Sequence, residues 1–169
     1  MKNILESKFM VEMMKTASNM YRLGWDERNG GNISYLLADY DLSLYLDLSK
    51  VERVIPLGFD ASPLKGQCFL VIGTGKYFKN VETDPENNLG IVRIGEDGVS
   101  AELLWGFKDG GRMTSEFPAH LMSHMARLEK DEENRIVMHC HPTYTLAMNY
   151  VHPLDEKEFT HSLWQMCTE

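Results

Sequence analysis

Apolar residues recur at helical spacing in four parts of the chain. Asn3 and Glu6 have the spacing of a capping box, and apolar side chains then recur every three or four residues as far as Gly24. This pattern predicts a first helix that ends at the glycine. Helical patterns also cover residues 114–128, 143–151 and 155–167. The predicted helices therefore lie towards the two ends of the chain.

Strand-like runs fill the region between these helices. Short apolar runs predict strands at residues 33–37, 69–72, 91–94, 99–105 and 136–140. Another strand is predicted over residues 39–50, where leucines alternate with polar side chains. The Gly- and Asp-containing segment 95–98 is typical of a hairpin turn. Helices around a strand-rich region with a hairpin predict a three-layer α/β/α sandwich with a largely antiparallel central sheet.

Composition places the chain among ordinary globular proteins. The 169 residues contain 43% hydrophobic and 25% charged residues, with no repeat or low-complexity segment, so we expect a single domain over residues 1–169. The net charge of −8 argues against nucleic acid and anionic membranes as partners. No apolar stretch approaches the roughly 20 residues of a membrane span. Three widely spaced cysteines, Cys68, Cys140 and Cys167, without a CxxC motif favour the cytoplasm.

The sequence His139-Cys140-His141 is the strongest local candidate for a metal site. In a strand, side chains alternate between faces, so His139 and His141 project together while Cys140 points away. Imidazole is a good ligand for zinc and neighbouring transition metals. An ordinary pair of buried or exposed histidines explains the motif equally well, so both interpretations stay open.

Glu116 is a candidate acid/base. It falls in the predicted first turn of the helix that precedes the histidine strand, where the helix dipole favours a carboxylate. Beside a metal, such a group can move a proton to or from a polarised carbon or hydroxyl. An N-terminal helix carboxylate without further function is the alternative.

Two glycine clusters are candidate anion sites. Residues 29–32 (Asn-Gly-Gly-Asn) precede a predicted strand, and residues 73–76 (Gly-Thr-Gly-Lys) follow another. Glycines allow successive backbone N–H groups to surround a phosphate. Neither cluster has the spacing of a Walker A loop or a dinucleotide fingerprint, and ordinary turns are the alternative.

The remaining histidines have simpler interpretations. His120 and His124 are four residues apart on one helix face, which is also a metal-ligand spacing, but no HExxH arrangement accompanies them. We expect core or interface roles for both. His152 and His161 carry no motif and are expected at surface or helix-end positions.

Taken together, these segments resemble the class II aldolase family, and within it the rhamnulose-1-phosphate aldolase branch. The resemblance is carried by five stretches in matching order, at residues 24–32, 73–76, 88–92, 114–120 and 137–141. It implies a class II aldolase/adducin-like fold and zinc-dependent retro-aldol cleavage of L-rhamnulose 1-phosphate to dihydroxyacetone phosphate and L-lactaldehyde. It also implies a homotetramer.

The resemblance further implies a role for each matching residue. His139 and His141 match two of three histidine ligands of Zn2+, and Glu116 matches the catalytic acid/base. The positions that hold the substrate phosphate or lie beside it are matched by Asn29, Gly31, Asn32, Thr74, Gly75 and Ser115. Glu169 matches a carboxylate that a neighbouring subunit contributes to the site.

The third histidine ligand of the family has no match in this sequence. We therefore expect an N-terminal part of a longer family domain, either a fragment or a natural truncation, with weak zinc binding and little activity by itself. Two alternatives stay open. One is a non-catalytic aldolase-fold module used for binding or assembly, and the other is a related aldolase or epimerase acting on a different sugar phosphate.

Overall fold

The computed structural model describes residues 1–38 and 40–166. Its six strands form one sheet in the order β2-β5-β4-β3-β1-β6, and every pairing between these strands is antiparallel. The strands are β1 (Asn32–Leu36), β2 (Arg53–Pro56), β3 (Cys68–Ile72), β4 (Leu89–Ile94), β5 (Ser100–Gly106) and β6 (Ile136–His139). The helices are α1 (Lys8–Arg22), α2 (Phe78–Val81), α3 (Pro85–Asn88), α4 (Phe117–Leu128), α5 (Thr143–Val151) and α6 (Glu156–Met166), with 3-10 turns η1 (Ile4–Glu6), η2 (Leu42–Leu44) and η3 (Ser62–Leu64).

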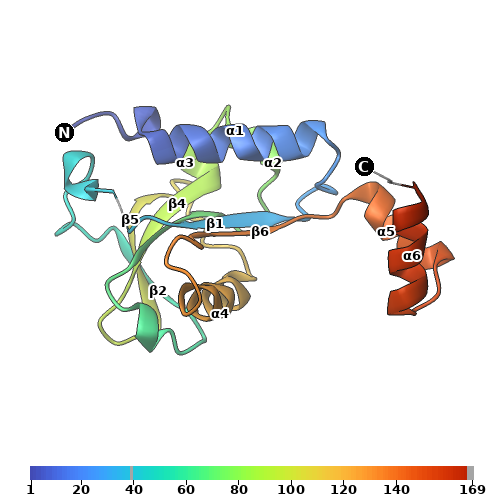
Figure 1. The fold of residues 1–169 in the computed structure, drawn as a ribbon. Coiled ribbons are helices and arrows are strands. Elements are labelled where there is room, and N and C mark those ends of the chain that lie inside the picture. The colour runs from blue at the N-terminus through green and yellow to red at the C-terminus, as the bar shows by residue number, and fades with distance from the viewer. Residues whose placement is uncertain (39, 167–169) are drawn as a thin grey trace.

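The sheet is covered on both faces. Helices α1, α2 and α3 lie on one face and α4 lies on the other (Figure 1). Two hydrophobic clusters separate the layers, one containing Phe9 and Met13 of α1 and the other containing Phe117 and Leu121 of α4. The predicted three-layer α/β/α sandwich with an antiparallel sheet is therefore confirmed.

Helix α1 begins later than the sequence pattern suggests. The Asn3 side chain accepts a hydrogen bond from the Leu5 N–H within η1, so the capping-box residues belong to this short turn. The long helix is capped by Ser7, whose hydroxyl accepts from the Met10 N–H. It ends as predicted: Gly24, at φ +70°, follows the last turn.

Strand β1 presents different chemistry to the two helical layers. Ile33 packs into the cluster beneath α1, whereas Leu36 packs into the cluster beneath α4. Because side chains alternate along a strand, Asn32 and Ser34 face α4 together with Leu36. Both polar residues are buried, so the α4 side of this strand carries polar groups inside the molecule.

The strand predicted over residues 39–50 is wrong. In the described part of this segment, η2 follows Asp41, and no strand forms. The Asp41 and Asp47 carboxylates each accept a hydrogen bond from the backbone N–H two residues later, at Ser43 and Ser49. Such local bonds give the backbone an alternative to a sheet ladder, and the leucine alternation does not outweigh them.

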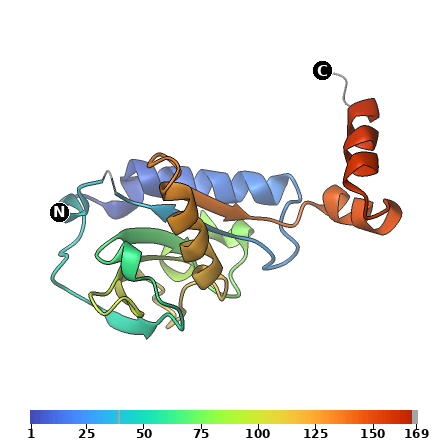
Figure 2. The same cartoon turned by 60° about the horizontal axis from the view of Figure 1, so that its bottom comes forward.

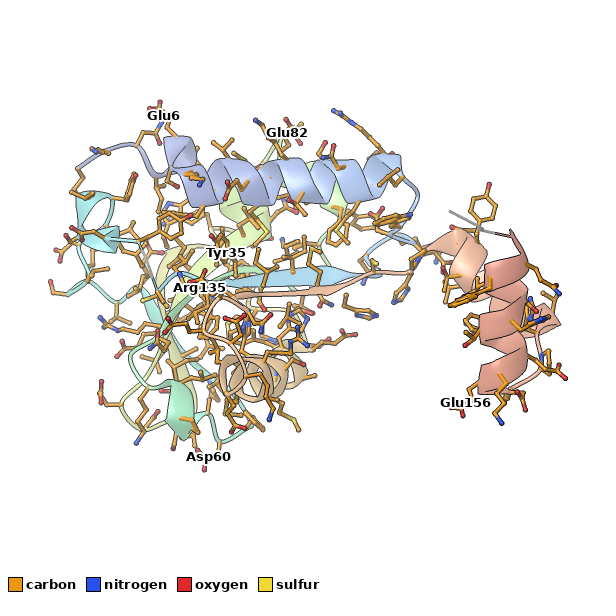
Figure 3. All side chains as sticks on the ribbon, in the orientation of Figure 1. Glu6, Tyr35, Asp60, Glu82, Arg135 and Glu156 are labelled. Atoms are coloured by element: carbon orange, nitrogen blue, oxygen red, sulfur yellow. The ribbon has the colours of Figure 1, made fainter. Side chains whose placement is uncertain are left out.

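The remaining predicted strands are confirmed, including the β4–β5 hairpin. The sequence pattern missed β2, an edge strand of four residues, as well as the single-turn helices α2 and α3. These elements are too short for a periodic pattern to stand out. In Figure 3, Glu82, which follows α2, lies on the α1 side of the sheet, and Asp60 lies on the opposite side.

Helices α5 and α6 were predicted and form, but they contribute little to this core. Both lie beyond the end of β6, apart from the sandwich (Figures 1 and 2), and Glu156 marks the start of α6 in Figure 3. Large side chains such as Tyr150, Leu154 and Trp164 are exposed. Among the described residues, no helix is both long and apolar enough to cross a membrane.

Candidate active site

Four segments that are far apart in the sequence meet at one end of the sheet. The turn after β3 lies beside the segment before α4, because Gly73 forms a β-bridge with Met113. Asn32 opens β1, pairs with His139 of β6 in the sheet register, and its amide donates to Glu116 Oε2 at 3.1 Å. The sheet thus brings together both glycine clusters, the candidate acid/base and the histidine pair.

His139 and His141 converge as the strand alternation predicts. Their Nε2 atoms are 3.1 Å apart and their ring centroids 4.8 Å apart. Two imidazoles bound to one tetrahedral zinc ion would hold their nitrogens about 3.3 Å apart, from Zn–N bonds of roughly 2.0–2.1 Å. Cys140, between them, packs against the hydrophobic cluster beneath α1 and does not join the pair.

Glycines 30 and 31 let the turn before β1 press against this pair. A Cβ atom on Gly30 would lie 2.6 Å from His141 Nδ1, and one on Gly31 would lie 3.0 Å from the His139 carbonyl oxygen. Gly31 also has φ +117°, which disfavours other residues. The backbone N–H of His141 donates a hydrogen bond to the backbone carbonyl of Trp25 at 2.7 Å. The first glycine cluster therefore shapes the wall behind the histidines.

Glu116 precedes helix α4 by one residue, because the helix begins later than the sequence pattern suggested. It is the N-cap of α4 instead of a first-turn residue, and its side chain makes no capping bond. Its Oε2 atom instead accepts from Asn32 and approaches His139 Nδ1 at 2.6 Å. Partial burial opposes ionisation, but the hydrogen bonds from Asn32 and His139 outweigh it, and the pKa of Glu116 lies below its usual value. The group is a carboxylate at neutral pH.

The donor chemistry fits a transition ion such as Zn2+. A metal-bound histidine commonly donates a hydrogen bond from its second ring N–H to a carboxylate. His139 Nδ1 has this relation to Glu116. His139 and His141 could hold such an ion through Nε2. In residues 1–38 and 40–166, however, no group of three His, Cys, Asp or Glu side chains converges. The described chain thus supplies two ligands.

The candidate phosphate-binding residues differ in exposure and in whether their side chains already have hydrogen-bond partners. Asn29 and Ser115 are exposed, and Gly75 lies in a turn at φ +69° directly after Thr74. Asn32 differs, because its amide is buried and both of its polar ends have partners: Oδ1 is bonded to His120 Nε2 and Nδ2 to Glu116. The structure brings the Thr74 turn and Ser115 to the same end of the sheet but commits the Asn32 side chain elsewhere.

Lys76 is the cationic residue of the second glycine cluster. Its ammonium group is paired with the Asp109 carboxylate, within hydrogen-bond distance. A phosphate at this turn would therefore depend chiefly on backbone N–H groups and hydroxyls. Such neutral donors are compatible with the acidic net charge.

His120 and His124 are core residues, as predicted. They are 3% and 0% exposed, and burial lowers the pKa of each ring to about 4. His120 Nδ1 and His124 Nε2 both bond to the Ser34 hydroxyl, at 2.7 and 2.8 Å. Sequence reasoning missed Ser34. The available signal was its position two residues after Asn32, on one strand face, opposite two histidines at helical spacing.

The remaining expectations concern Glu169 and the histidines His152 and His161. Glu169 lies outside the described residues. His161 is exposed on α6, whereas His152, at the end of α5, is half-buried and packs edge-on against Phe159 with ring centroids 5.7 Å apart. The structure places neither histidine with the His139 and His141 pair.

Comparison with known proteins agrees with this architecture. Residues 11–168 match the family described as "Class II Aldolase and Adducin N-terminal domain". The chain is 59% identical over 168 residues to a rhamnulose-1-phosphate aldolase of Listeria monocytogenes serotype 4a, covering 99% of this chain and 62% of that protein. It is 57% identical over 167 residues to the enzyme of the same name from Enterococcus faecalis, covering 99% of this chain and 60% of that protein.

A solved structure shows the same fold. The crystal structure of a sugar-phosphate aldolase from Thermotoga maritima matches with a TM-score of 0.65 and 31% identity, covering 80% of this chain and 54% of that one. The chain thus spans about three fifths of the length of the curated relatives cited above, at 62% and 60%. By its sequence and its fold, the chain belongs to the class II aldolase and adducin N-terminal domain family.

Proposed function

We propose that this chain carries the N-terminal part of a Zn2+-dependent aldolase active site that cleaves L-rhamnulose 1-phosphate to dihydroxyacetone phosphate and L-lactaldehyde. The proposal rests on one observation, the sequence of contacts between Glu116, His139 and His141. Glu116 Oε2 lies 2.6 Å from His139 Nδ1, and His139 Nε2 lies 3.1 Å from His141 Nε2. A proton-transfer group thus lies beside a two-imidazole metal site. The relatives' names support the substrate, and we propose that residues 1–169 form the N-terminal part of a longer class II aldolase-like domain.

Glu116 is the proposed acid/base. Asn32 and His139 hold its carboxylate in the ionised form, which is the form that accepts protons. In the condensation direction it takes a proton from the carbon beside the carbonyl of dihydroxyacetone phosphate. In cleavage the hydroxyl that becomes the aldehyde oxygen loses its proton as the carbon–carbon bond breaks, and Glu116, once protonated, delivers a proton to the carbon that this leaves. A divalent cation, when bound to His139 and His141, polarises the carbonyl and the neighbouring hydroxyl and spreads the negative charge that develops.

The substrate phosphate is assigned to the glycine turns. The turn with Thr74 and Gly75 follows Gly73, which bridges to Met113 just before Ser115 and Glu116, and Gly31 lies in the turn against the histidines, two residues after Asn29. Binding the phosphate there orients the ketose so that the carbon chain extends towards Glu116. Such positioning supplies a large part of the rate enhancement in reactions of this kind.

We also propose a homotetramer in the cytoplasm. The exposed apolar side chains on α5 and α6 support an assembly that covers them. The free thiols of Cys68 and Cys140 support a reducing compartment. The homotetramer is proposed for the complete enzyme, so sedimentation of the complete enzyme checks it, and a sedimentation coefficient that stays at the monomer value at all concentrations would oppose it.

The decisive experiment introduces the substitutions into the complete enzyme and measures release of dihydroxyacetone phosphate from L-rhamnulose 1-phosphate with excess Zn2+. We expect Glu116→Gln to reduce the rate by about 10²–10⁴-fold, the usual contribution of a general acid/base. Glu156→Gln, a matched exposed change on α6, leaves the rate unchanged. Equal rates for Glu116→Gln and the unaltered complete enzyme would refute the acid/base role. Phosphate binding without any cleavage would favour a non-catalytic module instead.

A further inference from the structure

A continuous row of hydrogen bonds crosses the interior from α4 to the candidate active site. It runs from His124 through the Ser34 hydroxyl to His120, and from there through the Asn32 amide to Glu116. All four residues before Glu116 are buried, with exposures of 5% or less. We propose that Ser34, His120 and His124 are positioning residues that fix the orientation of the Asn32 amide and, through it, the Glu116 carboxylate.

The direction of every bond in the row follows from its end at Glu116. A carboxylate only accepts hydrogen bonds, so the Asn32 NH2 group must face Glu116 and the Asn32 carbonyl oxygen must face His120. His120 therefore donates from Nε2 to Asn32. A neutral imidazole has one N–H, which leaves His120 Nδ1 as an acceptor for the Ser34 hydroxyl proton.

The far end of the row agrees with this direction. Because the Ser34 hydroxyl donates to His120, its oxygen is left to accept from His124 Nε2–H. His124 Nδ1 then carries no proton, and among the described residues it has no hydrogen-bond partner. Phe69 packs against the His124 ring with centroids 5.0 Å apart. Burial in these surroundings keeps both rings neutral, as their lowered pKa values indicate.

The same direction sets the state of the metal-facing histidine. Glu116 Oε2 accepts from His139 Nδ1–H, so a neutral His139 carries no proton on Nε2, the atom that faces His141 Nε2 at 3.1 Å. If the amide of Asn32 were reversed, its oxygen would face the carboxylate and repel it. The buried row thus holds Glu116 in the place where it selects the metal-binding tautomer of His139.

This inference deepens the proposed function, since Glu116 is the acid/base in both, but its first test needs neither metal nor substrate. Ring-nitrogen NMR of the metal-free chain distinguishes protonated from unprotonated imidazole nitrogens. We expect His120 and His124 to be neutral with the proton on Nε2. A proton on Nδ1 of either ring would overturn the row's direction, whatever the outcome of the aldolase assay.

Substitutions then test whether the row positions Glu116. We expect Ser34→Ala to abolish the protection of the Asn32 side-chain amide protons from exchange and to weaken Zn2+ affinity by about 10-fold, the lower end of the effect of outer-shell partners. Ser7→Ala is the matched control, because it also removes a buried serine hydroxyl that makes one local bond, far from the row. It should leave the Asn32 amide protons and the affinity unchanged.

Position 124 offers a second, conservative test. Gln can place an N–H near the position of His124 Nε2, so His124→Gln should keep the Asn32 amide protected, whereas His124→Leu should lose that protection as Ser34→Ala does. Equal spectra and equal Zn2+ affinity for His124→Leu and the unaltered chain would overturn the positioning role.

Discussion

The two pairs of neighbouring histidines in this molecule lie in opposite environments. His120 and His124 are sealed between α4 and β1, where the Ser34 hydroxyl bonds to both. His139 and His141 lie at the end of the edge strand β6, and the His139 side chain is 39% exposed. In the buried pair, three of the four ring nitrogens have hydrogen-bond partners inside the protein, whereas the half-exposed pair turns its two Nε2 atoms towards each other.

This difference indicates a structural role for the buried pair and a ligand-binding role for the half-exposed pair. A buried imidazole is neutral and held by packing, so it suits a fixed hydrogen-bond arrangement. An exposed pair can exchange protons and reach a ligand. Glu116 belongs to both regions, because it connects to the buried row through Asn32 and to the exposed pair through His139. Each region can therefore be perturbed separately while the state of Glu116 is followed.

The largest effect is expected from removing the exposed pair. His139→Ala or His141→Ala should reduce Zn2+ affinity by more than the roughly 10- to 100-fold that loss of an outer partner costs, because each removes a ligand itself. Isothermal titration of metal-free protein measures the affinity. His161→Ala, an exposed change on α6, is the control. Unchanged affinity in either variant would separate the pair from metal binding.

The next largest effect is expected from acid, which should lower the free energy of unfolding through the buried pair. The pKa of each buried ring is about 4 when folded, against 6.5 for the ordinary side chain. As pH falls below about 6.5, the unfolded chain binds protons that the folded chain cannot, so the free energy of unfolding falls until pH nears 4. The loss is on the order of 3 kcal/mol per ring at most.

Urea unfolding across this pH range measures the effect. His124→Gln removes one of the two titrating rings, so its stability should depend less steeply on pH than that of the unaltered chain. His161→Gln, which removes an exposed ring, should keep the steep dependence. If His124→Gln keeps it as well, the buried ring is not the source.

A smaller effect is expected where the glycine turn touches the exposed pair. In Gly30→Ala the added methyl group would meet His141 Nδ1 and the Glu27 carbonyl, at 2.6 and 2.9 Å. We expect a loss of about 1–3 kcal/mol in the free energy of unfolding, together with weaker Zn2+ binding, because His141 must move.

Gly58→Ala separates contact from backbone strain. Gly58 has φ +64° and no atom within 4 Å of an added Cβ, so alanine there strains only the backbone. It should cost stability but leave Zn2+ affinity unchanged. Weakened metal binding in Gly58→Ala would show that the Gly30 result reflects general destabilisation.

The smallest effect is expected outside the sandwich. Trp164 of α6 is 76% exposed, so Trp164→Ala should change the free energy of unfolding of the monomer by no more than about 0.5 kcal/mol. Phe69→Ala, beneath the buried histidines, should cost about 3–5 kcal/mol. A large loss for Trp164→Ala, measured at the lowest practical protein concentration, would mean that α6 packs against the sandwich.

Local patterns predicted the elements whose hydrophobic contacts extend over several residues. The apolar spacing of α1 and the runs of β3, β4 and β5 gave the layers and the antiparallel sheet. The pattern failed at residues 39–50, where Asp41 and Asp47 bond to nearby backbone N–H groups, because apolar alternation carries no information about that competition.

The sequence alone determined which groups could do chemistry: the His139 and His141 pair from strand alternation, and Glu116 as a nearby carboxylate. Only the tertiary structure decided what each group touches. The sheet pairs Asn32 with His139, and α4 packs against β1, so residues 84 positions apart, Asn32 and Glu116, share a hydrogen bond. The hydrogen bonds of Ser34 were decided there as well, since a hydrogen bond depends on distance and direction in space, which a one-dimensional pattern does not contain.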